Sequence, residues 1–369
     1  MKIDAFDEVV IMKRSVKEIN FGGLEEKKKA AMEIKRLAKG DDKTRRALAE
    51  LGVIPPLVAM AVESEVDACK MLAVEALVEL ANGSFRNKKL IVEAGLLKKL
   101  PRLIHTQSLI SNHQFTHLLF SISSLAKTPF PLSSFHILPF LLKILDSKEN
   151  DDETKLTCLS TLHNLSAKLE NVKHIATPNT VQALLTSSSN KAVSEQALAT
   201  LSNLIATTIG KKAIGDDPLV PKIFIDVLTW DDKPKCQELS VYLLMTIAHK
   251  CIMERQKMIS LGIVPVLLEL ALLGSSLARK RALKLLEWLK HEEDKRIGVH
   301  SGPQARRLEI LSGCVDEGEI EENKRNVKKL VKQSLDKNME LIMRRAKGAE
   351  GCSGVKVLVA TSSSKSLPY

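Results

Sequence analysis

Aromatic residues are scarce in this sequence: they make up 4% of its 369 residues, with two Trp and two Tyr. β-Strands are enriched in aromatic and β-branched residues, so this scarcity argues against a β-sandwich or barrel. Leu, Ala, Lys and Glu are abundant instead. This composition favours helices that pack through aliphatic layers.

Cysteine patterns and long apolar runs are also lacking. The six Cys include no CxxC pair, which argues against a zinc or disulfide framework, and we expect reduced thiols in an intracellular protein. No apolar run approaches the ~18 residues of a membrane helix. The short apolar run 9–12 is followed at once by Lys13 and Arg14, so we expect neither a signal peptide nor a membrane span, and a soluble protein.

The net charge of +11 invites a nucleic-acid hypothesis, but the placement of the charge weakens it. Basic residues alternate with acidic ones, as in 25–29 and 321–325, and no aromatic residues stand among them to stack on bases. We therefore expect no specific nucleic-acid partner. Salt-dependent binding to polyanions or to a membrane surface stays open as a further alternative, although membrane contact is disfavoured.

Catalytic and metal-binding patterns are incomplete. His113 and His117 have the spacing of two zinc ligands on a helix, but Gln114 stands where a catalytic Glu would, and no third ligand is apparent. Gly210 opens a basic turn that lacks the Ser or Thr of a phosphate loop. We predict that the protein is not an enzyme and binds no metal or cofactor.

What the sequence does contain is a Leu or Ile that recurs at intervals of 39 to 45 residues. These seven residues, which we call the anchors, are Leu37, Leu80, Leu125, Leu165, Leu204, Ile247 and Leu289. A second Leu or Ile stands three residues before each anchor, and a small residue stands seven before six of them. The spacing describes one face of a helix, and a repeat of this period predicts a helical solenoid.

Each interval contains the same three segments: a polar turn with basic residues, a strongly apolar segment, and the helix that bears the anchor. Gly and Pro mark the boundary between the first two segments, as in Gly52 to Pro56, and set a sharp corner there. Three helices in about 40 to 45 residues are typical of armadillo or HEAT repeats.

Sequence motifs distinguish between these two types of repeat. Residues 87–97 and 262–268 resemble the first half of an armadillo repeat, and residues 159–165 and 198–204 resemble its third helix. Residues 25–58 resemble the armadillo region of plant U-box proteins. The resemblance implies an all-α, right-handed armadillo-type solenoid of about six three-helix repeats. One repeat departs from the pattern, because 129–131 (Pro-Phe-Pro) replaces its first helix, and we expect an irregular turn there.

In armadillo proteins the third helices line a concave groove, and the positions one and five before each anchor would face it. They are Met32 and Arg36, Glu75 and Glu79, Phe120 and Ser124, Ser160 and Asn164, Ala199 and Asn203, Tyr242 and Thr246, Lys284 and Trp288. All but Met32, Glu75 and Ala199 are our candidates for contact with a partner protein.

The comparison with importin-α-like proteins limits this hypothesis. They carry Trp and Asn at these two positions, whereas no such pair is complete here, so a nuclear-import receptor is disfavoured. Asn164 and Asn203 could hydrogen-bond an extended peptide. Alternatively, they bridge neighbouring helices, and Phe120 and Tyr242 pack between repeats.

We predict a capping helix at 1–23, the solenoid at 24–290, a connector at 291–318, a basic amphipathic helix at 319–346 and a disordered Ser-rich tail at 347–369.

No segment resembles a U-box, so ubiquitin transfer by this chain alone has no support. The leading hypothesis is a non-catalytic scaffold or adaptor that binds peptide or helical segments of other proteins in the groove. A substrate adaptor of the ubiquitin pathway is the alternative, and we expect a location in the cytoplasm, the nucleus or both.

Overall fold

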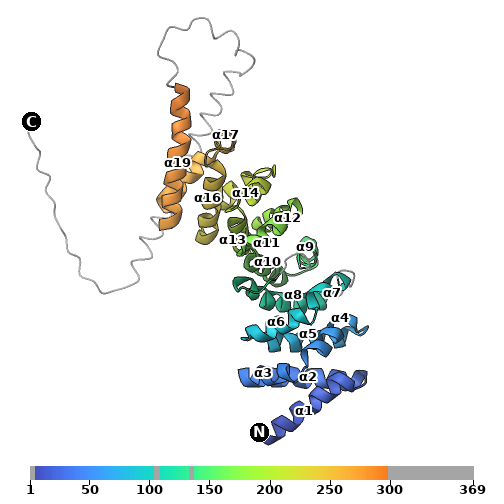
Figure 1. The fold of residues 1–369 in the computed structure, drawn as a ribbon. Coiled ribbons are helices and arrows are strands. Elements are labelled where there is room, and N and C mark those ends of the chain that lie inside the picture. The colour runs from blue at the N-terminus through green and yellow to red at the C-terminus, as the bar shows by residue number, and fades with distance from the viewer. Residues whose placement is uncertain (1–4, 104–108, 133–136, 298–369) are drawn as a thin grey trace, which may run out of the picture. The chain divides into compact units, whose positions relative to one another are not determined.

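The protein is a succession of α-helices. The computed structural model describes residues 5–103, 109–132 and 137–297, and within these ranges it contains no strand. Residues 1–293 form one compact unit, in which the helices follow one another in chain order (Figure 1). The basic helix and the Ser-rich tail predicted for 319–369, and the connector beyond residue 297, lie outside the described residues.

In the described ranges, two leading helices are followed by six repeats, five with three α-helices and the third with two, which confirms the predicted all-α solenoid. The leading helices are α1 (Ala5–Phe21) and α2 (Leu24–Gly40). The first three repeats are α3 (Asp42–Glu50), α4 (Ile54–Glu63) and α5 (Asp67–Ala81); α6 (Phe85–Glu93), α7 (Leu96–Leu103) and α8 (Leu109–Ser123), which continues into η1 (Ser124–Lys127) with the anchor Leu125; and α9 (Leu138–Asp146) with α10 (Asp152–Ser166). The last three are α11 (Leu169–Ile175), α12 (Pro178–Ser188) and α13 (Ser194–Leu204); α14 (Thr208–Gly215), α15 (Lys222–Leu228) and α16 (Pro234–Ala248); and α17 (Ile252–Ser260), α18 (Ile263–Leu273) and α19 (Ser276–Ile297).

The anchors lie in the core, as their spacing predicts. All seven are at most 2% exposed, and the residues seven before them are fully buried in α5, α8, α10, α13, α16 and α19. The last repeat differs in one detail, because Leu285 is buried while Leu286, three before the anchor Leu289, is only half-buried. Removing these aliphatic side chains from water is the main source of stability for a stack of amphipathic helices.

Glycine makes the corner between the first and second helices. Gly52, Gly95 and Gly262 have φ values of +81°, +87° and +76°, a left-handed conformation that side chains with a Cβ rarely adopt. In the first repeat Pro55 and Pro56 follow in the first turn of α4, where a missing N–H costs no hydrogen bond.

The polar residues that recur in the first helices hold the end of the preceding third helix. The Nδ2 of Asn87 donates to the carbonyl oxygen of Leu80 at 2.8 Å, and that of Asn171 donates to Leu165 at 3.1 Å. Arg255 does the same to Ala248 at 2.9 Å. Because the last carbonyls of a helix have no partner within it, these side chains have a structural role.

The irregular repeat is confirmed and follows a 3-10 turn. After η1 the chain bends at 128–130, and the described residues form no α-helix before α9. Proline at 129 and 131 lacks the N–H that helical hydrogen bonds require there. In this repeat α10 is therefore supported by α9 and by its neighbours α8 and α13, without a regular first helix.

Three further observations concern single segments or residues. No described helix is by itself long and apolar enough to cross a membrane, while α17 and α18 together meet this length and composition test but are bent by 86°. The last helix, α19, extends to Ile297, beyond the expected end of the solenoid at residue 290. Burial raises the pKa of the Cys158 thiol, which packs as a small core residue.

Candidate functional site

The third helices of successive repeats lie side by side: α2 packs on α5, α5 on α8, α8 on α10, α10 on α13 and α13 on α16. We call the surface formed by the positions one and five before the anchors the third-helix face. It runs along the described solenoid without a missing third helix, even at the irregular repeat (Figure 1).

Most candidate residues on the third-helix face can be reached from solvent. Arg36, Phe120 and Lys284 are exposed. Half-buried positions are Glu79, Ser124, Ser160, Asn203, Tyr242, Thr246 and Trp288. Asn164 is the exception, with 9% of its surface exposed. These side chains are spread along the solenoid, one or two to a helix.

The two central Asn side chains bridge neighbouring repeats. The Nδ2 of Asn164 donates to the Oγ of Ser123 at 2.9 Å, from α10 to α8. The Nδ2 of Asn203 donates to the Oγ of Ser166 at 2.9 Å and lies 3.3 Å from the Nδ1 of His163, from α13 to α10. These contacts match the bridging alternative, and binding of a peptide backbone by these amide N–H groups would require breaking them.

His163 completes this network as a neutral ring. Burial and nearby Lys127 lower its pKa, and a hydrogen bond with the backbone of Ala199 opposes this shift in part. If Asn203 donates to its Nδ1, that nitrogen must carry a lone pair. The centre of the third-helix face is thus an uncharged hydrogen-bonded strip.

Charged and aromatic side chains occupy the two ends of the third-helix face. Arg36 pairs with Glu33 and Lys284 with Glu287 on their own helices, contacts that a partner could replace at little cost. Near the C-terminal end, the guanidinium of Arg281 lies 5.1 Å from the ring centroid of Tyr242. The Trp288 ring centroid lies 5.7 Å from that of His249. Tyr242 and Trp288 therefore already pack between α16 and α19.

A second row of exposed side chains was not predicted from the sequence. Phe85, Leu169, Ile209 and Ile252 stand at the first or second residue of four first helices and are 53%, 71%, 53% and 49% exposed. We call them the first-helix row. Each follows an anchor by four or five residues, a regularity that could have revealed the row. Exposed apolar residues that recur in one structural position are typical of binding surfaces.

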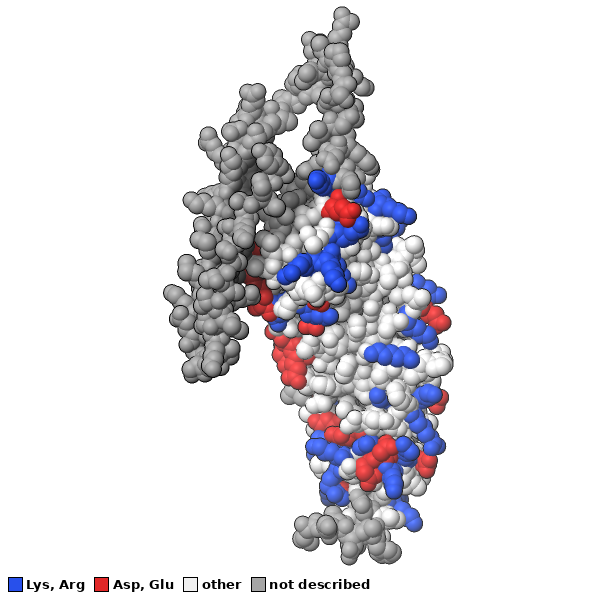
Figure 2. Space-filling view, turned by 90° about the vertical axis from the view of Figure 1, so that its left-hand side faces the viewer, with Lys and Arg blue, Asp and Glu red and all other residues white. Residues whose placement is uncertain are grey.

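Charge does not form one continuous patch on the face seen in Figure 2. Acidic and basic side chains are interspersed there, with uncharged surface between them. Interspersed charges attract a polyanion less than a basic stripe would. Polar and apolar contacts on the third-helix face and the first-helix row are therefore the stronger candidates for recognition.

Plant U-box proteins are similar in sequence to part of this chain. No family model matches the sequence. The chain is 25% identical over 268 residues to U-box domain-containing protein 45 of Arabidopsis thaliana, and 30% identical over 195 residues to U-box domain-containing protein 7 of the same plant. These matches cover 71% and 51% of this chain. They span only 34% and 25% of the two relatives.

Among solved structures, the crystal structure of an engineered protein matches with a TM-score of 0.63 and 24% identity, over 76% of this chain and 68% of that one. The chain is an all-α solenoid of helical repeats. Its relatives over the repeats are plant U-box proteins, of which it spans about a quarter to a third. A solenoid of this kind presents extended surfaces along its repeats.

Proposed function

We propose that the protein is a non-catalytic interaction scaffold that binds a segment of another protein along the third-helix face. One observation carries this proposal: the third helices from α2 to α16 pack side by side, and most of the candidate positions on them and on α19 are exposed or half-buried and differ in chemistry. An extended or helical segment can follow such a surface and place one side chain per repeat.

Phe120 is the central apolar contact in this proposal. It is 41% exposed and stands between acidic Glu79 on α5 and the neutral strip on α10 and α13. Exposed aromatic side chains that become buried on binding contribute strongly to affinity. Asn164 serves the scaffold instead, because its amide joins α10 to α8.

A peptide-display selection on the purified full chain tests this assignment. The affinity of a selected peptide is measured by fluorescence polarisation for the wild type, Phe120→Ala and Phe85→Ala. These two variants remove the same ring from two exposed positions, one on the third-helix face and one in the first-helix row. We expect Phe120→Ala to weaken binding about tenfold or more, and Phe85→Ala to leave it unchanged. The opposite result would move the binding surface to the first-helix row.

The similarity to U-box proteins favours a second function, that of a substrate adaptor in the ubiquitin pathway. In this alternative the solenoid selects the substrate and another protein transfers ubiquitin. Incubation of the purified chain with ubiquitin and its activating and conjugating enzymes should leave the chain unmodified. Self-modification would contradict the non-catalytic part of both proposals. The cytoplasmic or nuclear location and the lack of specific nucleic-acid binding stay predictions.

A further inference from the structure

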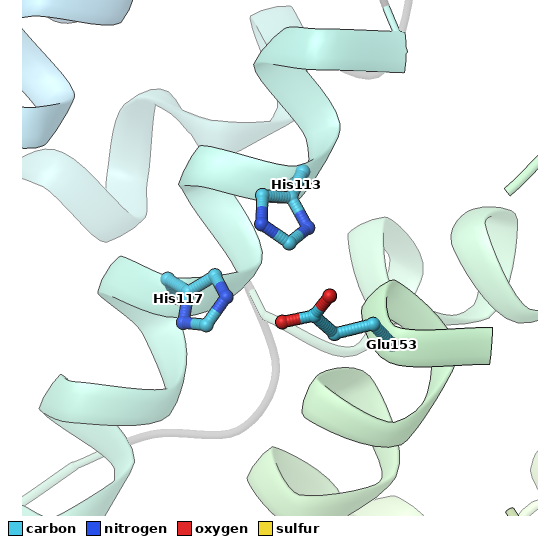
Figure 3. Close-up of side chains that lie close together, drawn as sticks. All are labelled: His113, His117 and Glu153. Atoms are coloured by element: carbon cyan, nitrogen blue, oxygen red, sulfur yellow. The ribbon is translucent and has the colours of Figure 1, made fainter. Parts of the chain in front are cut away.

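Two histidines and a glutamate meet where α8 packs on α10. Figure 3 shows the rings of His113 and His117 and the carboxylate of Glu153 turned toward one another. One potential ligand atom from each side chain lies within 4.8 Å of those of the other two. No other group of three such side chains comes as close in the part of the chain that the structure describes.

The repeat itself brings these residues together. His113 and His117 are one turn apart on α8 and share a face of that helix. Glu153 lies twelve residues before the anchor Leu165, as His113 lies twelve before Leu125, so the two occupy equivalent positions on adjacent third helices. The third ligand that the sequence seemed to lack is supplied by the next repeat.

A chain of hydrogen bonds orients the ring of His113. Its Nδ1 lies 2.9 Å from the Oγ1 of Thr154, a side chain that is almost fully buried. The backbone N–H of Thr154 in turn donates to the carboxylate of Asp151 at 3.0 Å. With Nδ1 held by the hydroxyl, Nε2 is the nitrogen of His113 that remains for a metal. Metal-binding histidines commonly have their second nitrogen fixed in this way.

The second ring packs against the first. The centroids of the two imidazole rings are 4.6 Å apart, with the ring planes at 72°. Burial, and then the proximity of His113, lower the pKa of His117, while Glu153 opposes this shift. A neutral imidazole offers a lone pair to a cation.

We propose that His113, His117 and Glu153 form a binding site for a divalent transition metal, with zinc as the test ion, that links α8 to α10. Two imidazoles and a carboxylate provide three zinc ligands, and water completes the tetrahedron. Zinc bonds of about 2.0–2.1 Å place ligand atoms about 3.3 Å apart, so the side chains must close in by up to about 1.5 Å. Glu153 is exposed, and rotation of its side chain can provide most of this movement.

The position of the site indicates a structural role for the metal. It joins the third helices on either side of the irregular turn, where α10 has no regular first helix of its own repeat beside it. A ligand that binds the folded state stabilises it according to its concentration and affinity. Bound metal therefore stabilises the α8–α10 contact at the centre of the third-helix face.

Equilibrium dialysis of the full, reduced chain against zinc chloride tests the site, with thermal unfolding as a second measurement. Glu153→Gln removes the carboxylate charge from an exposed position and leaves the fold undisturbed. His117→Gln removes a ring ligand. His174→Gln is the matched control, because His174 is exposed on α11 and lies outside the cluster.

We expect the wild type to bind one zinc ion that Glu153→Gln and His117→Gln hold at least about tenfold more weakly. The zinc-dependent rise in melting temperature should shrink in both variants and persist in His174→Gln. Equal zinc affinity of the wild type and Glu153→Gln would overturn the proposal, and so would an equal loss in His174→Gln. Because Glu153 is exposed, its variant decides the question even if His117→Gln fails to fold.

Discussion

Ion pairs join neighbouring repeats at the N-terminal end of the solenoid, whereas neutral hydrogen bonds join the third helices at its centre. At the N-terminal end, ion pairs connect successive repeats from side chains that retain contact with water. They are Lys35 with Glu75 at 2.8 Å, Arg86 with Glu50 at 2.6 Å and Lys99 with Glu63 at 2.7 Å.

At the centre, amide and hydroxyl groups join the third helices. Asn164 reaches Ser123 and Asn203 reaches Ser166, both at 2.9 Å. Ser123 is fully buried and Asn164 nearly so, whereas Arg86 and Glu50 are more than half exposed.

The difference has a physical consequence. Breaking an exposed ion pair costs little folding free energy, because water solvates both charges. A buried polar group left without a partner costs its full desolvation energy. The central repeats should therefore hold a fixed register, while the N-terminal repeats can exchange their side-chain contacts for those of a partner.

The largest effect is expected for Asn164→Ala. This change removes the amide that Ser123 accepts from and leaves a small gap between α8 and α10, so we expect the free energy of unfolding to fall by about 1–3 kcal/mol. Chemical denaturation followed by circular dichroism measures it. Ser160→Ala, a half-buried polar position on the same helix, is the control and should change stability by less than about 0.5 kcal/mol. Equal effects of both changes would contradict a special role for the bridge.

A smaller effect should appear as a pH dependence of the central contact. The pKa of His163 is lowered in the folded state by burial and by Lys127, so the unfolded chain takes up the proton first. Stability should therefore fall as the pH drops below about 6.5, the ordinary pKa of histidine, toward the folded value.

His163→Gln, which cannot take up this proton, should lose less stability than the wild type between pH 7 and pH 5. Denaturation midpoints over this range measure the difference. A wild type and variant with parallel pH profiles would show that His163 does not titrate differently in the folded and unfolded chain.

The helices in both regions were predictable from the sequence, whereas the side-chain contacts between them were not. The anchors revealed the third helices because burial imposes a helical period on one chain segment. The sequence shows that Asn164 and Asn203 occupy equivalent positions, but whether they face a partner or a neighbouring helix depends on which side chains the previous repeat places beside them. Here it offers Ser123, Ser166 and His163.

Residues that act across repeats were the ones most easily missed. Glu153 completes the cluster with His113 and His117 only because α10 lies beside α8, and a motif search within one helix cannot see it. The first-helix row was overlooked for another reason, since single exposed apolar residues carry no meaning until their spacing is compared between repeats. Exposure of Phe85 or Leu169 becomes informative once both occupy the same place in the repeat.

At the N-terminal end, the Lys35–Glu75 pair should show a modest and salt-sensitive contribution. Its side chains are 36% and 21% exposed, so water and ions screen the attraction in part. A double-mutant cycle with Lys35→Met and Glu75→Gln should give a coupling energy of about 0.2–1 kcal/mol at low salt, and less in 1 M salt. A coupling that is as large as the Asn164→Ala effect and independent of salt would remove the contrast between the two regions.

The smallest effect is expected for Arg86 and Glu50, whose side chains are 63% and 56% exposed. Both ions keep most of their hydration in the pair, and holding two long side chains together costs conformational entropy, so the net contribution should be too small to measure. Arg86→Met and Glu50→Gln, alone and together, should leave the denaturation midpoint unchanged. Their effect on binding of a selected peptide is the more telling measurement. If these exposed charges serve a partner rather than the fold, affinity should change while stability does not.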